Sequence, residues 1–141
     1  MGLVYAEIEL VNSLDVGLSK RGYIEEGQIR TEKVKALVDS GAYMLCINEK
    51  IKNQLGLDRY GDGHQTAQLA NGEIVKLEIV GPVDVRFLNR STTTRAMVLP
   101  GDAEVLLGAI PMEDLDVIID PLKQTLALPP DRPYLAQKSL K

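Results

Sequence analysis

The triplet Asp39-Ser40-Gly41 has the clearest potential for chemistry in this sequence. Water attacks an amide slowly. Two carboxylates that share one proton accelerate this hydrolysis, because one activates the water and the other protonates the carbonyl oxygen. Asp39 follows the apolar residues Ala36 to Val38, and Gly41 permits a tight loop. The same triplet also forms ordinary turns, so its surroundings must decide between the two interpretations.

Other reactive side chains are sparse. Cys46 is the only cysteine and lies in the apolar run from Tyr43 to Ile47, so we interpret it as a small buried hydrophobe and not as a nucleophile. His64 is the only histidine, and one His beside Asp62 is too little for a zinc site. We therefore expect neither a metal nor an organic cofactor.

Charge and hydropathy narrow the classes of partner. A formal net charge of −4 argues against nucleic-acid binding, and we interpret Arg86, Arg90 and Arg95 as the solvated rim of a turn. The first ten residues hold no basic start and no long apolar run, so we expect no secretory signal and no membrane partner. With a single cysteine, a reducing compartment fits best, and we expect a soluble cytoplasmic protein.

The elements that must position Asp39 are mostly strands. Alternating or continuous apolar runs predict strands over residues 3–11, 23–30, 33–38, 65–69, 73–79, 83–88, 93–99, 104–107, 117–119 and 124–128. Asn71-Gly72 predicts a hairpin turn between two of them, and Gly81-Pro82 predicts a turn between the next two. Short helices are expected over residues 49–55, between Asn48 and Gly56, and over 111–115.

These features, in this order, resemble the retropepsin-like aspartic peptidases, and in particular their small cellular members in bacteria, over about residues 3–128. Residues 36–42 look like the catalytic loop of that family, and Leu106-Leu107-Gly108 resembles the motif that packs beneath it. Residues 110–115 look like the helix that follows, and Leu69-Ala70-Asn71-Gly72 resembles the tip of the flap that closes over bound peptide.

The resemblance implies an all-β fold, a closed β-barrel equivalent to one lobe of the acid protease fold, with a flap hairpin and one or two short helices. It assigns residues 1–128 to the peptidase domain. Residues 129–141, rich in Pro and Lys, are expected to form an extended or partly disordered C-terminal tail.

The resemblance also implies how the site is assembled. One triplet in 141 residues is half a site, so a homodimer would bring Asp39 of each chain together to hydrolyse a peptide or protein substrate. Asp39 would be the catalytic residue. The supporting residues would be Ser40, Gly41 and Ala42 in the catalytic loop, Leu69, Ala70, Asn71 and Gly72 in the substrate-binding flap, and Leu106, Leu107 and Gly108 beneath the loop.

The commonest triplet of the family has Thr at the position of Ser40. Serine keeps the hydroxyl that, in the family, braces the catalytic loops of the two halves of the site against each other, but it lacks the methyl group of threonine. We therefore expect Ser40 to affect catalytic efficiency more than mechanism. The alternative function is a non-catalytic dimeric module that binds a peptide or partner protein. The presence of Asp39 between small residues favours the enzyme.

Overall fold

The computed structural model describes residues 2–68 and 71–133. Seven strands form the main sheet: β1 (Tyr5–Asn12), β2 (Thr31–Val38), β3 (Leu45–Asn48), β4 (Asp58–Gln68), β5 (Ile74–Phe87), β6 (Arg90–Leu99) and β7 (Leu106–Leu107). A separate hairpin consists of β8 (Ile118–Asp120) and β9 (Thr125–Ala127). The helices are α1 (Ser13–Lys20), α2 (Glu49–Leu55) and α3 (Ala109–Leu115), together with a 3₁₀ turn, η1 (Glu26–Gln28).

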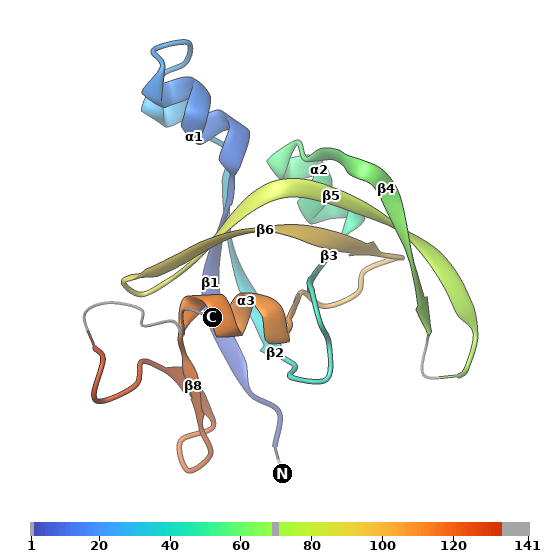
Figure 1. Cartoon of the computed structure of the whole chain (residues 1–141), viewed down its shortest axis with the longest axis vertical. Coiled ribbons are helices and arrows are strands. Elements are labelled where there is room, and N and C mark those ends of the chain that lie inside the picture. The colour runs from blue at the N-terminus through green and yellow to red at the C-terminus, as the bar shows by residue number, and fades with distance from the viewer. Residues whose placement is uncertain (1, 69–70, 134–141) are drawn as a thin grey trace, which may run out of the picture.

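The main sheet closes into a barrel. Its strand order is β1-β2-β7-β3-β6-β5-β4, and an additional pairing of β1 with β5 joins the two sides. β4 stays outside the closed part and forms a long hairpin with β5, which curls away from the barrel (Figure 1). The predicted all-β fold with one closed barrel and a flap hairpin is therefore confirmed.

Aliphatic side chains fill the barrel because successive residues of a strand point to opposite faces. In β1, for example, Ala6, Ile8 and Leu10 are buried, whereas Glu7 between them is exposed. The fully buried residues come from nearly every strand and from α2 and α3, and they include Leu10, Leu45, Ile47, Leu55, Val80, Val83, Val85, Leu107 and Leu115. Burial of these side chains is the main force that holds the barrel together.

The predicted helix at residues 49–55 is confirmed as α2. The side-chain oxygen of Asn48 accepts a hydrogen bond from the amide of Ile51 at 2.9 Å and caps the first turn. Gly56 ends the helix with a φ of 63°, in the left-handed region that glycine adopts readily. The second predicted helix also forms, as α3, and begins two residues before Pro111.

The strand predicted at residues 23–30 is wrong. That stretch holds η1, whose start is fixed by reciprocal hydrogen bonds between Glu25 and Gln28, and it follows a helix, α1, that the sequence did not predict. The signal for α1 was present, because the Asn12 side chain caps it by accepting from the amide of Asp15 at 3.1 Å. Gly17 in the middle of this short helix obscured it, since glycine disfavours helices.

The turn predicted at Gly81-Pro82 is also wrong, because β5 continues through both residues. The pairing register between β5 and β6 shifts by one residue between Val80 and Val83, so β5 contains a bulge there. A bulge bends a strand without ending it. One strand therefore serves both the flap and the barrel wall.

An ion pair ties the α1 insertion back to the barrel. The guanidinium of Arg30 donates to both oxygens of Asp15 at 2.8 and 3.0 Å, and the backbone amide of Arg30 donates to the same carboxylate at 3.0 Å. The Asp15 side chain is only 6% exposed. Hydrogen bonding from Arg30 lowers the pKa of Asp15 below its ordinary value. None of the described helices is long and apolar enough to cross a membrane.

Replacing Asp15 with Asn is expected to lower the free energy of unfolding at neutral pH by about 2 kcal/mol, because a buried charge-assisted pair is lost. A lowered carboxyl pKa stabilises the fold above the ordinary carboxyl pKa and ceases to do so as the pH falls through the lowered value. The difference between variant and wild type should therefore shrink on acidification. Urea unfolding across a pH series measures this, and a difference that is constant down to strong acid would contradict it.

Candidate active site

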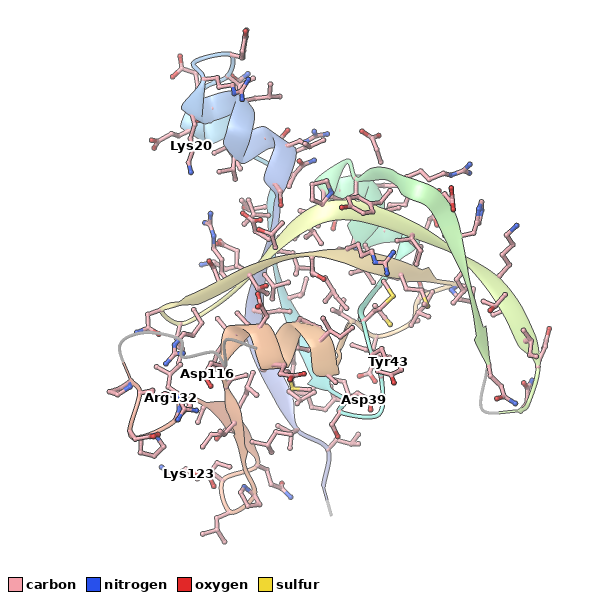
Figure 2. All side chains as sticks on the ribbon, viewed as in Figure 1. Lys20, Asp39, Tyr43, Asp116, Lys123 and Arg132 are labelled. Carbon is pink, nitrogen blue, oxygen red and sulfur yellow. The ribbon has the colours of Figure 1, made fainter. Side chains whose placement is uncertain are left out.

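Asp39 follows the last residue of β2 and begins a tight loop. Its backbone amide donates to the carbonyl of Leu107 at 3.0 Å, and its own carbonyl accepts from Ala42 at 3.1 Å. The carboxylate oxygen Oδ1 accepts from the backbone amide of Gly41 at 2.9 Å. Figure 2 shows Asp39 in this loop, with Tyr43 nearby. The carboxylate is thus held in a half-exposed position at the end of a barrel strand.

The motif Leu106-Leu107-Gly108 packs directly beneath this loop. Leu106 and Leu107 form β7, which pairs in parallel with the end of β2 and antiparallel with β3. A Cβ atom on Gly108 would lie 2.3 Å from the carbonyl oxygen of Met44 and 2.8 Å from that of Ala42. Both contacts are with backbone, so only glycine fits without moving the loop.

The first turn of α3 completes the support. The amide of Ala109 donates to the carbonyl of Ala42 at 2.7 Å, and the amide of Ile110 donates to the carbonyl of Tyr43 at 2.9 Å. These are amides that a helix start leaves without intrahelical partners. The structure therefore brings the loop of residues 39–42 and residues 106–108 together, as the sequence predicted for these segments.

A cavity of about 380 Å³ opens beside Asp39. It lies between the Asp39 loop, β3, β6 and the two flap strands, and it is lined mainly by apolar side chains: Met44, Cys46, Leu77, Met97 and Leu99. Sequence reasoning did not assign any of these lining residues to the site. The alternation of Met97 with Leu99 on β6 was the available signal, but it does not reveal which face of a barrel strand borders a cleft.

The flap hairpin forms as Asn71-Gly72 predicted. β4 pairs with β5 in register from His64 opposite Glu78 to Gln68 opposite Ile74. The Asn71 side chain accepts from the amide of Glu73 at 2.9 Å, and Gly72 has a φ of 86°. Leu69 and Ala70, which were predicted at the flap tip, lie outside the described residues.

An ion pair anchors the flap to the body of the barrel. Lys52 of α2 lies 2.7 Å from the carboxylate of Glu78 on β5, and Arg59 lies 4.0 Å from the same carboxylate. Glu78 sits in the part of β5 that forms the flap, so the base of the hairpin is attached to α2. The flap tip, further along the hairpin, lacks this attachment among the contacts of the described residues.

Cys46 and Ser40 lie close to Asp39 in the sequence and differ in their exposure to solvent. Cys46 is buried, and burial together with the charge of Asp39 raises the pKa of its thiol to about 11, which keeps it protonated at neutral pH. Ser40 is exposed, and its side chain has no hydrogen-bond partner among the described residues.

No group of three or more His, Cys, Asp or Glu side chains in the described part of the chain could hold a metal ion.

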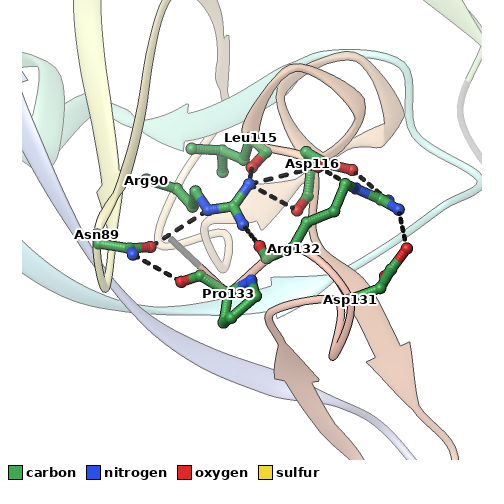
Figure 3. A network of polar contacts seen from close by, with 7 residues as sticks. All are labelled: Asn89, Arg90, Leu115, Asp116, Asp131, Arg132 and Pro133. Atoms are coloured by element: carbon green, nitrogen blue, oxygen red, sulfur yellow. Dashed lines mark hydrogen bonds and ion pairs between the residues drawn. The ribbon is translucent and has the colours of Figure 1, made fainter. Parts of the chain in front are cut away.

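The interpretation of Arg90 as a solvated rim is wrong. Its side chain is 1% exposed and donates to the carbonyls of Leu115 and Asp116 at 3.4 and 3.3 Å, and also to the backbone carbonyl of Arg132 (Figure 3). Arg132 in turn forms a two-point ion pair with the Asp116 carboxylate at 2.8 and 2.9 Å. The cation is buried because it satisfies the carbonyls at the end of α3.

Replacing Gly108 with Ala is expected to destabilise the protein by roughly 2–3 kcal/mol, because the new methyl overlaps the backbone of residues 42–44. Gly17 is a matched control, since a Cβ there meets nothing within 4 Å in the interior of α1. Gly17→Ala should stabilise by about 0.5–1 kcal/mol. Thermal and urea unfolding of both variants measure these changes, and equal effects of the two substitutions would contradict the account of Gly108.

Comparison with known proteins agrees with this geometry. No curated protein matches the chain. The crystal structure of the retroviral protease-like domain of Ddi1 from Leishmania major is similar over 99% of both chains, with a TM-score of 0.56 and 16% sequence identity, which shows a shared fold. Residues 26–112, more than half of the chain, match the family described as "gag-polyprotein putative aspartyl protease". The chain therefore belongs to the retropepsin-like aspartic protease family.

Proposed function

We propose that the protein is an aspartic endopeptidase that works as a homodimer, with one Asp39 carboxylate from each chain in a shared site. The observation that carries the proposal is the position of Asp39. Its carboxylate is fixed by the Gly41 amide, on a loop braced from below by Gly108, and it opens onto a cavity beneath the flap. A rigid carboxylate beside a sheltered apolar cleft is what hydrolysis of a peptide requires.

The chemistry follows from two carboxylates that hold one proton between them. The ionised carboxylate takes a proton from a water molecule, which attacks the carbonyl carbon of the scissile peptide bond. The protonated carboxyl donates its proton to the carbonyl oxygen, so that a neutral tetrahedral intermediate forms. The carboxyl that took the proton from water then passes it to the amine nitrogen, the other carboxylate takes a proton from a hydroxyl of the intermediate, and the C–N bond breaks to give an amine and a carboxylic acid. This sequence needs neither a metal nor an organic cofactor.

A dimer is needed because one chain offers one such carboxylate. Asp39 is half-exposed and Ser40 is exposed, so both can face a second copy across a twofold axis. In the proposed dimer the Ser40 hydroxyl braces the partner's loop. Because Ser40 lacks the methyl group of the commoner Thr, this contact would be looser and turnover would be slower.

An apolar surface next to the Asp39 loop supports the dimer. The amide of Val38 donates to the carbonyl of Val4 at 2.8 Å, so the N-terminal segment lies against the end of β2, and Gly2 lies against Gln124 of the β8–β9 hairpin. The N-terminal segment and the β8–β9 hairpin expose large apolar side chains that a single chain leaves in water: Leu3 (67%), Ile118 (41%), Ile119 (40%) and Leu122 (94%). A local concentration of exposed apolar side chains favours an interaction site in this part of the molecule.

The substrate we propose is an extended peptide held between the flap and the floor of the dimer. The flap edge offers backbone groups for strand addition, and residues 69–72 would close over the peptide. The cavity of about 380 Å³ would take one apolar side chain next to the scissile bond, since Met44, Leu77 and Met97 line it. Free Cys46 suits a reducing compartment, and we propose that the enzyme acts in the cytoplasm.

Asp39→Asn should reduce peptide cleavage at mildly acidic pH by at least about 100-fold, because the general acid–base pair is lost. The dimer and the unfolding midpoint should persist. Asp102→Asn, in an exposed turn, is the matched control and should retain full activity. Cleavage that survives Asp39→Asn would contradict the proposed site, and a wild-type dimer that cleaves no peptide in a diverse library would favour the non-catalytic binding module.

Leu122→Glu should raise the dimer dissociation constant at least about tenfold, because a charge replaces an apolar side chain that dimerisation buries. Activity per chain should then fall on dilution. Leu14→Glu, on the α1 helix at the opposite end of the molecule (Figure 1), is the control and should change neither property. Analytical ultracentrifugation measures the constant, and equal dissociation of both variants would contradict the proposed surface.

A further inference from the structure

Two polar side chains of β6 are buried on the same side of the strand. The buried polar side chains among the described residues are Asn12, Asp15, Arg90 and Thr92. The first two cap and anchor α1, whereas Arg90 and Thr92 lie two positions apart on β6 and therefore point to one face. A buried polar group costs free energy unless it is hydrogen-bonded, so the partners of these two residues indicate what they do.

Both side chains contact the C-terminal end of α3. The hydroxyl of Thr92 donates to the carboxylate of Asp114. The guanidinium of Arg90 donates to the carbonyls of Leu115 and Asp116 at 3.4 and 3.3 Å, and it lies 3.4 Å from the Asp116 carboxylate (Figure 3). Three consecutive residues at the end of the helix are thus held by one strand.

These polar contacts supply what apolar packing of α3 does not. Met112 and Leu115 bury one face of the helix in the core. Hydrophobic contacts are not directional, so they tolerate a small rotation or translation of a helix. Hydrogen bonds have preferred distances and angles, so the contacts from β6 fix the rotation of α3 and its position along its axis.

The other end of α3 holds the loop that carries Asp39. The amides of Ala109 and Ile110 donate to the carbonyls of Ala42 and Tyr43 at 2.7 and 2.9 Å. α3 has seven residues and is only about 10 Å long, so it moves as one body. A displacement at its C-terminal end therefore reaches the catalytic loop.

We propose that Arg90 and Thr92 are positioning residues that set the geometry of the Asp39 carboxylate through α3. The proposal rests on the proposed peptidase function, because it concerns how the catalytic carboxylates are aligned. The described residues that line the cavity beside Asp39 include neither Arg90 nor Thr92. Their influence on the site therefore passes through the helix and the loop that it supports.

Thr92→Val tests the proposal with a side chain of similar shape that lacks the hydroxyl. The Asp114 carboxylate borders a hollow of about 530 Å³ where water can replace the lost donor, so the urea unfolding midpoint should change little. Amide hydrogen exchange at Ala109 and Ile110 should become at least about fivefold faster, whereas exchange in β1 should stay unchanged. This measurement needs no substrate, so its failure is distinguishable from failure of the proposed function.

Thr93→Val is the matched control. The Thr93 hydroxyl also donates to a carboxylate, that of Asp84 on β5, at 2.7 Å, so the control loses the same kind of bond without touching α3. It should leave exchange at Ala109 and Ile110 unchanged, and Thr92→Ser should restore most of the protection. Wild-type exchange in Thr92→Val, or equal acceleration by Thr93→Val, would overturn the proposal.

Enzyme kinetics separate positioning from a purely structural role. Arg90→Lys keeps the charge but loses the planar fork that contacts two carbonyls and a carboxylate together. Arg90→Lys and Thr92→Val should each lower kcat at least about fivefold per folded chain and change KM less than about twofold, because the alignment of the carboxylates changes and the cavity does not. A loss confined to KM, or a fall in activity that only follows the loss of folded protein, would overturn the positioning role.

Discussion

The close contact between Gly108 and the backbone of residues 42–44 is the constraint on which the site depends. It allows β7 to pass directly beneath the Asp39 loop, where the Leu107 carbonyl accepts a hydrogen bond from the Asp39 amide. The first two amides of α3 donate to the carbonyls of Ala42 and Tyr43. Each side of the loop is then fixed by backbone hydrogen bonds, which leaves the carboxylate little freedom. Such rigidity in the supporting shell is what a catalytic constellation requires.

The molecule divides into a barrel, which carries the Asp39 loop, and a flap hairpin attached to it. The barrel holds Asp39 at the end of β2, while the bulge in β5 carries the same strand outward into the flap without interrupting it. The ion pair of Lys52 with Glu78 fixes the base of the hairpin.

Local signals predicted much of this arrangement. Asn48 and Gly56 cap the two ends of α2, Asn71-Gly72 lies in the turn of the flap hairpin, and Asp39 directly follows β2. These features succeed because each depends on a few neighbouring residues.

What the sequence did not reveal depends on contacts between distant segments. The guanidinium of Arg90 is buried because it donates to the carbonyls of Leu115 and Asp116, some 25 residues later in the chain. No pattern in the sequence around Arg90 predicts these contacts. The lining of the cavity beside Asp39 comes from four separate parts of the chain. The α1 insertion was missed for a different reason, since Gly17 weakens the helical signal that its cap supplies.

The central claim is that two copies bring identical carboxylates together, and a crystal structure of the assembled protein at the pH of activity tests it most directly. The account predicts a twofold dimer in which the two Asp39 carboxylates approach within about 3 Å, close enough to share a proton. A protein that crystallises and sediments only as a monomer, or a dimer whose Asp39 residues face away from the twofold axis, would contradict it.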